Sequence, residues 1–141
     1  MTIRLVAIDP DTIAFGWALL ENRLLVATDV AITPYLPEFK GHVHYVCEIP
    51  EDRPGTRYRK NDILALALAA GRIVGCRDCT FRTPTQWKGQ IPKKVHHERM
   101  RGVMSTAELR VLDWALTRVG KGSQPEILDA VALCLTELGR L

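Results

Sequence analysis

Three short apolar runs, separated only by turn-forming residues, occupy the first 30 positions and restrict how the chain can fold. The runs RLVAI (4–8), FGWALLE (15–21) and RLLVATDV (23–30) are rich in the branched and aromatic residues typical of strands. Turn chemistry (Pro10-Asp11-Thr12) follows the first run, and Asn22 alone separates the second from the third. A fourth alternating run, HVHYVCEIP, covers 42–50. We therefore predict an antiparallel meander followed by a further strand.

Helical patterns dominate the rest of the chain. Asn61 can cap an apolar helix over 62–74 that ends at Gly75 and should be well buried, because it is apolar nearly all round. The later segments are predicted as a strand (79–83), a loop (84–94), a short basic helix (95–104), an amphipathic helix after the capping box Ser105-Thr-Ala-Glu108, and a helix over 125–141 that starts with proline. This order predicts an α/β fold: a mixed five-stranded sheet with helices on its faces.

Composition is that of a globular domain, with 47% apolar and 25% charged residues. We expect one domain over 1–141. No apolar run approaches the about 18 residues of a membrane span, and MTIRLVAID is unlike a signal peptide, so we expect a cytoplasmic protein. Cys47 and Cys134 lie in apolar runs and are read as small core residues. Cys76 and Cys79 form a single CxxC pair, which fits a loop and strand better than a metal or redox site.

Charge is distributed unevenly along the chain. Residues 1–52 carry a net charge of −5, residues 53–101 carry +9, and residues 102–141 carry −1. A basic middle segment indicates a polyanionic partner and favours nucleic acid, although a solvated basic face is the simpler alternative.

Four carboxylates stand where an ordinary core would not place them. Asp9 follows the apolar run of the first strand, and Glu48 follows that of the fourth. Glu126 and Asp129 are three residues apart near the start of the last helix and so share one face. A cluster of buried acids is tolerable only with cations, and oxygen ligands suit Mg²⁺ or Mn²⁺. Two such ions about 3.5–4 Å apart can support hydrolysis of a phosphodiester.

Each acid also has a simpler interpretation. Asp9 before Pro-Asp can be a turn residue, Glu48 before proline can be a solvated strand end, and Glu126 can serve the helix macrodipole. Their joint occurrence, in this order and on these elements, favours the metal site.

The motifs VAIDPDTIAFGWALLE, VCEIPE and EILDAVALCL together resemble the RuvC-like Holliday-junction resolvases of the ribonuclease H superfamily, and most of all their short bacterial or phage-type members. NDILALALAAG and TPTQWKGQIPKK add to the resemblance, which spans nearly the whole chain. It implies a ribonuclease H-like fold with helices on both faces of the sheet.

The acidic tetrad of that family matches Asp9, Glu48, Glu126 and Asp129 position by position. The resemblance implies Mg²⁺-dependent cleavage of four-way DNA junctions by a homodimer with one active site in each subunit.

The chain departs from the family pattern at three places. Asp11 stands where a small residue is common, and it is either a fifth ligand or a turn residue. Glu126 stands where aspartate is usual. The aromatic wedge of the cellular members is absent after Glu48, where Ile49-Pro50-Glu51 follows, and Tyr58 is the nearest aromatic residue.

Basic side chains near the acids are predicted to contact DNA phosphates. Trp87 either stacks on a splayed base or anchors packing, and His96 and His97 are read as backbone-binding or surface residues rather than catalytic bases. Lys88 or Lys93 can stabilise charge on the scissile phosphate, and we favour Lys93 as the catalytic lysine. The predicted DNA-binding set is Arg53, Arg57, Tyr58, Arg59, Lys60, Trp87, Lys88, Lys94, His96 and Arg99.

The main hypothesis is therefore a metal-dependent, structure-selective DNA endonuclease. Two alternatives remain open: a branched-DNA or single-strand nuclease without strict junction preference, and a non-catalytic ribonuclease H-like DNA-binding module.

Overall fold

A computed structural model of the chain describes residues 2–52 and 60–141. Five strands form one sheet: β1 (Arg4–Asp9), β2 (Ala14–Glu21), β3 (Leu24–Ile32), β4 (Val43–Glu48) and β5 (Cys79–Arg82). The helices are α1 (Lys60–Val74), α2 (Pro84–Lys88), α3 (Lys93–Gly102), α4 (Thr106–Thr117) and α5 (Gln124–Glu137). No helix in the described ranges is long and apolar enough to cross a membrane.

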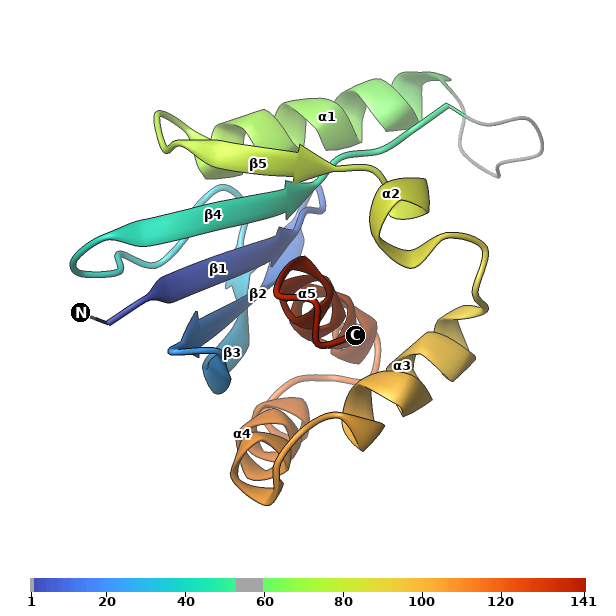
Figure 1. The fold of residues 1–141 in the computed structure, drawn as a ribbon. Coiled ribbons are helices and arrows are strands. Elements are labelled where there is room, and N and C mark those ends of the chain that lie inside the picture. The colour runs from blue at the N-terminus through green and yellow to red at the C-terminus, as the bar shows by residue number, and fades with distance from the viewer. Residues whose placement is uncertain (1, 53–59) are drawn as a thin grey trace.

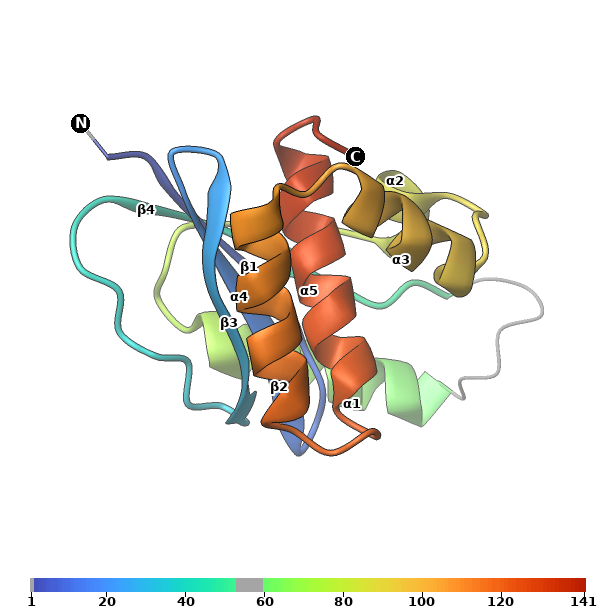
Figure 2. The same cartoon turned by 90° about the horizontal axis from the view of Figure 1, so that it is seen from below.

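The sheet has the order β3-β2-β1-β4-β5 and mixes the two kinds of pairing. β1, β2 and β3 form the predicted antiparallel meander, whereas β4 pairs with β1 and with β5 in parallel. α1 covers one face, and α4 and α5 cover the other (Figures 1 and 2). The predicted mixed five-stranded sheet with helices on both faces is confirmed.

The β2–β3 hairpin turns at Asn22 and Arg23, which have φ of 48° and 74°. Positive φ at two consecutive residues gives the turn the twist that antiparallel neighbours require, and asparagine adopts it more readily than most residues. This confirms the hairpin expected from the sequence.

α5 is the central helix of the fold: it packs along β1 and β2, and eight of its residues are buried. They include Ile127, Leu133 and Leu135, each at most 1% exposed. The helix ends at Glu137, short of the predicted residue 141, and Gly139 turns the chain with a φ of 71°.

α1 is less buried than the sequence predicted. Its four buried residues, Ala69, Ala70, Ile73 and Val74, all lie in its second half. Leu64 and Leu68, in contrast, are 62% and 68% exposed. The expectation failed because an apolar surface all round a helix shows what the helix can bury, not how much of it the sheet reaches.

The segment 84–94, predicted to be a loop, contains α2 and the start of α3. Thr83 precedes α2, and its backbone N–H donates to Gln86 Oε1 at 2.8 Å. Pro84 occupies the first turn, where its missing N–H costs nothing. A cap and a proline therefore start a helix that its short length and lack of apolar periodicity concealed.

A buried ion pair joins Glu108 of α4 to Arg140, close to the C-terminus. Glu108, in the capping box that the sequence predicted at Ser105, is 1% exposed. Its carboxylate accepts two hydrogen bonds from Arg140, at 2.8 and 2.9 Å, and one from the backbone N–H of Leu25 at 2.8 Å. Although burial opposes ionisation, these hydrogen bonds lower the pKa of Glu108 to about 2.

Replacing Glu108 by glutamine should destabilise the chain by about 3 kcal/mol at pH 7, because it leaves a largely buried guanidinium without its charge partner. Since the folded pKa of Glu108 lies below the unfolded one, this contribution is complete above about pH 4.5 and disappears as the pH falls toward 2. Denaturant unfolding of both proteins across this range measures the difference. The control is Asp113→Asn, which breaks the exposed Arg101–Asp113 pair and should cost under about 1 kcal/mol. Equal costs for the two substitutions would contradict the prediction.

Candidate active site

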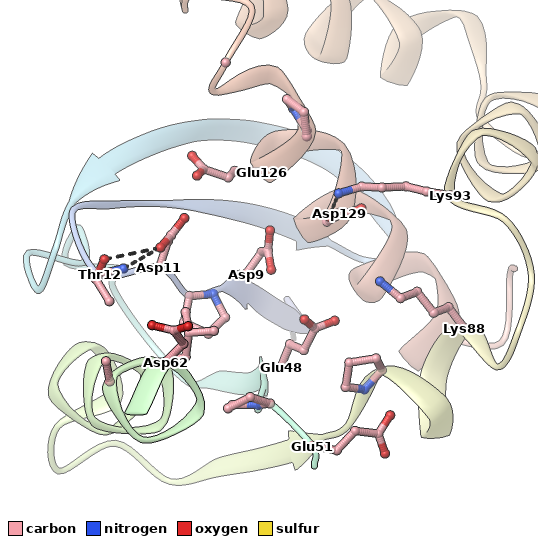
Figure 3. Close-up of a pocket in the computed structure, with 17 residues that line it drawn as sticks. Asp9, Asp11, Thr12, Glu48, Glu51, Asp62, Lys88, Lys93, Glu126 and Asp129 are labelled. Atoms are coloured by element: carbon pink, nitrogen blue, oxygen red, sulfur yellow. Dashed lines mark hydrogen bonds and ion pairs between the residues drawn. The ribbon is translucent and has the colours of Figure 1, made fainter. Parts of the chain in front are cut away.

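The acidic site lies at the edge of the sheet where β1 and β4 end. The two strands are parallel and adjacent, so Asp9 and Glu48, their last residues, meet at the same edge. The first turns of α5 bring Glu126 and Asp129 to this edge. All four predicted acids line one cavity of about 540 Å³ (Figure 3).

α5 can approach this edge of the sheet because residue 16 is a glycine, which has no side chain to block the helix. Gly16 in β2 is the antiparallel partner of Asp9, and a Cβ at this position would lie 2.1 Å from the backbone oxygen of Glu126. No side chain fits at that distance, so glycine allows the start of α5 to pack directly on the sheet beside the end of β1.

Burial and mutual repulsion raise the pKa of three of the acids. Burial raises that of Asp9 well above its ordinary value, and the charges of Glu48 and Asp129 add to the effect. The pKa of Glu48 is raised by burial as well. That of Glu126 rises to about 7, first through burial and then through a hydrogen bond with Asp11. A carboxylate with this pKa is about half protonated at neutral pH, so the cavity holds more acid than it can keep ionised.

Asp129 differs from the other three because it has two basic partners. Lys93 Nζ lies 2.7 Å from its Oδ2, and His97 Nε2 lies 2.8 Å from its Oδ1. Burial by itself would raise the pKa of Asp129, but these two hydrogen bonds outweigh that effect and lower the pKa overall. Lys88 also lines the cavity, so both lysines considered from the sequence face the acids (Figure 3).

His97 is a site residue that sequence reasoning missed, since it was read as a surface or backbone-binding residue. One signal was available: His97 follows Lys93 by four positions, so a helix that presents Lys93 to the acids presents His97 as well. That signal needed α3 to begin at Lys93, inside the segment predicted to be a loop.

Trp87 and His96, both predicted to bind DNA, are core residues. Trp87 is 6% exposed and donates its Nε1–H to Glu48 Oε2 at 2.6 Å. His96 is 4% exposed, and its ring packs edge-on against Trp87 with centroids 5.3 Å apart. The packing interpretation of Trp87 therefore holds, and neither ring is available to DNA. Trp87 lies in the segment predicted to be a loop, whereas His96 lies on the predicted short helix, whose basic sequence did not reveal that this side chain faces inward.

Further acids line the cavity besides the four that the sequence singled out. Asp11 lies beside Glu126 and accepts a hydrogen bond from the backbone N–H of Thr12 at 2.7 Å. Asp62, from the first turn of α1, and Glu51, which accepts hydrogen bonds from Thr85, also face it. Seven acids and two lysines therefore line one cavity.

The remaining predicted DNA contacts are exposed where the structure describes them. Arg53, Arg57, Tyr58 and Arg59 lie outside the described residues. Lys60 is exposed at the start of α1, and Lys94 and Arg99 are exposed on α3.

No group of three His, Cys, Asp or Glu side chains in the described ranges is arranged to hold a metal ion. Cys76 is exposed and Cys79 half-buried, both as free thiols, and Cys47 and Cys134 are buried core residues as predicted.

The donors of the acidic cavity nonetheless fit a hard cation chemically. All are carboxylates, and Glu126 Oε2 is buried without a hydrogen-bond partner in the described structure.

The fold resembles that of a structure of RuvC from Thermus thermophilus. The two chains are 16% identical, with a TM-score of 0.52 over 96% of this chain and 93% of the other. The chain has the RuvC-like fold that its motifs suggested. A second T. thermophilus structure, RuvC in complex with Holliday junction substrate, is 14% identical with a TM-score of 0.43, covering 96% and 92% of the two chains. No protein-family profile and no curated protein sequence matches the chain.

Replacing Gly16 by alanine should displace the start of α5 and destabilise the chain by about 1–3 kcal/mol, because the new Cβ collides with backbone that cannot rotate away. The matched control is Gly71→Ala in the middle of α1, where an added Cβ meets nothing within 4 Å. That change should be neutral or stabilising by up to about 1 kcal/mol. Thermal unfolding compares the two, and a Gly16→Ala protein as stable as the starting chain would contradict the close packing.

Proposed function

We propose that this chain is a divalent-metal-dependent endonuclease that cleaves branched DNA, such as a Holliday junction, by hydrolysing phosphodiester bonds. The observation that supports the proposal most strongly is the convergence of Asp9, Glu48, Glu126 and Asp129 on one cavity bordered by Lys88 and Lys93, in a RuvC-like fold. We propose that residues 1–141 act as a single nuclease domain.

The four carboxylates would hold Mg²⁺ or Mn²⁺, two ions in each site. The chemistry of the donors fits these ions, and a cation would relieve the repulsion that raises the pKa of Asp9, Glu48 and Glu126. When bound, the ions would activate a water molecule and stabilise the leaving oxygen.

Residues in and beside the cavity orient these acids and bind the substrate. His97 and Lys93 hold Asp129 from its two oxygens, and the indole N–H of Trp87 holds Glu48. With a phosphodiester in the cavity, the ammonium groups of Lys93 and Lys88 would stabilise the negative charge that develops on the scissile phosphate. We assign the catalytic role to Lys93 because its ammonium group already lies among the acids.

Phosphate contacts outside the cavity would come from the exposed cations. Lys60, Lys94 and Arg99 are available on α1 and α3. Arg53, Arg57, Tyr58 and Arg59 remain predicted contacts on the basis of the sequence.

Asparagine at Asp9 or at Asp129 should lower the cleavage rate at least about 100-fold, equivalent to about 3 kcal/mol of transition-state stabilisation, while DNA binding survives. A gel assay on a synthetic mobile four-way junction, with Mg²⁺, Mn²⁺ or EDTA, measures both properties. Asp113→Asn, on the exposed face of α4, is the control and should cleave normally. Undiminished cleavage by both site variants would reject the proposal.

The same assay separates the alternatives. Equal rates on junctions, flaps and plain duplex would replace the junction nuclease by a nuclease without junction preference. Calorimetry that finds no Mn²⁺ binding, even with DNA present, would favour a non-catalytic DNA-binding module.

We also propose that the chain acts as a homodimer and that α1 forms its interface. Leu64 and Leu68 are one helical turn apart on the same face and are both largely exposed. A two-fold interface buries the same patch on both subunits, so an apolar stripe of this kind suits it.

Sedimentation of the unmodified chain should therefore show twice the monomer mass. The double variant Leu64→Glu, Leu68→Glu should sediment as the monomer, because the new carboxylates of the two subunits would repel each other across the interface. Trp114→Glu on α4, which is 67% exposed, is the control and should leave the dimer intact. A dimer lost only with Trp114→Glu would assign the interface to α4, and a monomer at all concentrations, with and without DNA, would reject the dimer.

A further inference from the structure

A second groove lies between α3 and the start of α5, beside the acidic cavity. Its volume is about 420 Å³, within the range of small-ligand sites. The two helices lie side by side in both views of the fold (Figures 1 and 2). Lys93, Lys94 and His97, which have roles in the proposed function, are part of its lining, but that function assigns no ligand to the groove itself.

The two cavities share one wall. Lys93 lines both, and its ammonium group binds Asp129. His97 also lines the second groove while its ring contacts Asp129. A ligand that occupies the acidic cavity and continues past these two side chains therefore enters the second groove.

The lining combines an apolar floor with a basic rim. Pro125 and Leu128 of α5 form the apolar part, and Lys94 and Arg101 stand on the α3 side with Glu98 as the single acid. Arg101 is paired with Asp113 on α4, whereas Lys94 has no ion pair within the described part of the chain.

This combination favours one kind of occupant. A phosphate alone would make no favourable contact with the apolar floor. An apolar segment of a protein would leave the lysines at the rim without an anionic partner. A nucleotide carries both an anionic phosphate and a flat base that gains by leaving water.

We propose that this groove binds an unpaired nucleotide next to the scissile phosphate, with its base against Pro125 and Leu128 and its phosphate near Lys94. The inference rests on the proposed nuclease function, since it takes the scissile phosphate to lie in the acidic cavity. A paired base cannot enter the groove, so the groove favours DNA with an open branch over intact duplex. It thereby supplies a basis for selectivity in a chain that has no aromatic residue directly after Glu48.

The test measures binding without cleavage, in the full chain carrying Asp9→Asn. Two fluorescent DNAs of equal length are compared: a branched DNA with three unpaired nucleotides at the branch, and a fully paired duplex. Leu128→Ser removes part of the apolar floor, Lys94→Ala removes a cation of the rim, and Arg110→Ala removes an exposed cation of α4 as the matched control.

Leu128→Ser should weaken binding of the branched DNA at least about fivefold and binding of the duplex less than twofold. Lys94→Ala should weaken the branched complex more than Arg110→Ala does. Equal losses on both DNAs with Leu128→Ser, or no loss on either, would overturn the proposal. The proposal would also be overturned if Leu128→Ser changed the sedimentation of the protein without changing its affinity for DNA. That result would assign the groove to a protein partner.

Because Leu128 is half-buried, a second measurement does not depend on that substitution. A photoreactive thymine analogue at the unpaired position of the branched DNA should crosslink to α3 or to residues 125–128, as mass spectrometry locates. Crosslinks confined to other segments would refute the site. Cleavage by the chain with Asp9 intact is scored separately: a chain that cleaves branched DNA but shows no selective loss rejects the groove alone, and a chain with the selective loss but no cleavage rejects the nuclease alone.

Discussion

The direct packing of α5 on β2 at Gly16 is the contact on which the site depends. The sheet brings Asp9 and Glu48 together simply because β1 and β4 are parallel neighbours. It cannot bring Glu126 and Asp129 to the same place. These arrive because the backbone of Glu126 approaches β2 so closely that no side chain fits between them. The same helix contributes the largest share of buried residues to one hydrophobic core, so the burial that stabilises the domain also holds half of the acidic site in place.

The acidic cavity is organised around a conflict of charge. Seven acids face two lysines, so negative charge is in excess. Different carboxylates are stabilised in different ways. Asp129 is held by Lys93 and His97, and Glu48 by the indole of Trp87. Burial and the neighbouring carboxyl group of Asp11 raise the pKa of Glu126 to about 7. Glu108, far from this cavity, shows the contrasting case of a buried acid whose partners satisfy it completely and lower its pKa.

The tetrad of acids could be predicted because each member is tied to the end of a regular element, and element ends are visible in a sequence. Asp9 and Glu48 close apolar strand patterns, and Glu126 and Asp129 have the spacing of one helix face. The supporting residues could not be predicted in the same way. Trp87 belongs to α2, which is short and lacks the apolar periodicity that identifies a helix. His96 and His97 belong to α3, whose sequence predicts a helix but not which of its side chains face inward.

The sequence by itself therefore determined the strand order along the chain, the hairpin at Asn22, the capped helix after Ser105 and the positions of the four main acids. Each of these follows from local periodicity, capping or turn chemistry. Only the tertiary structure decided that Leu64 and Leu68 face outward, that Trp87 and His96 face inward, and that His97 meets Asp129. The physical reason is that local patterns set what a segment can bury, whereas the contacts between distant segments decide which surface is covered.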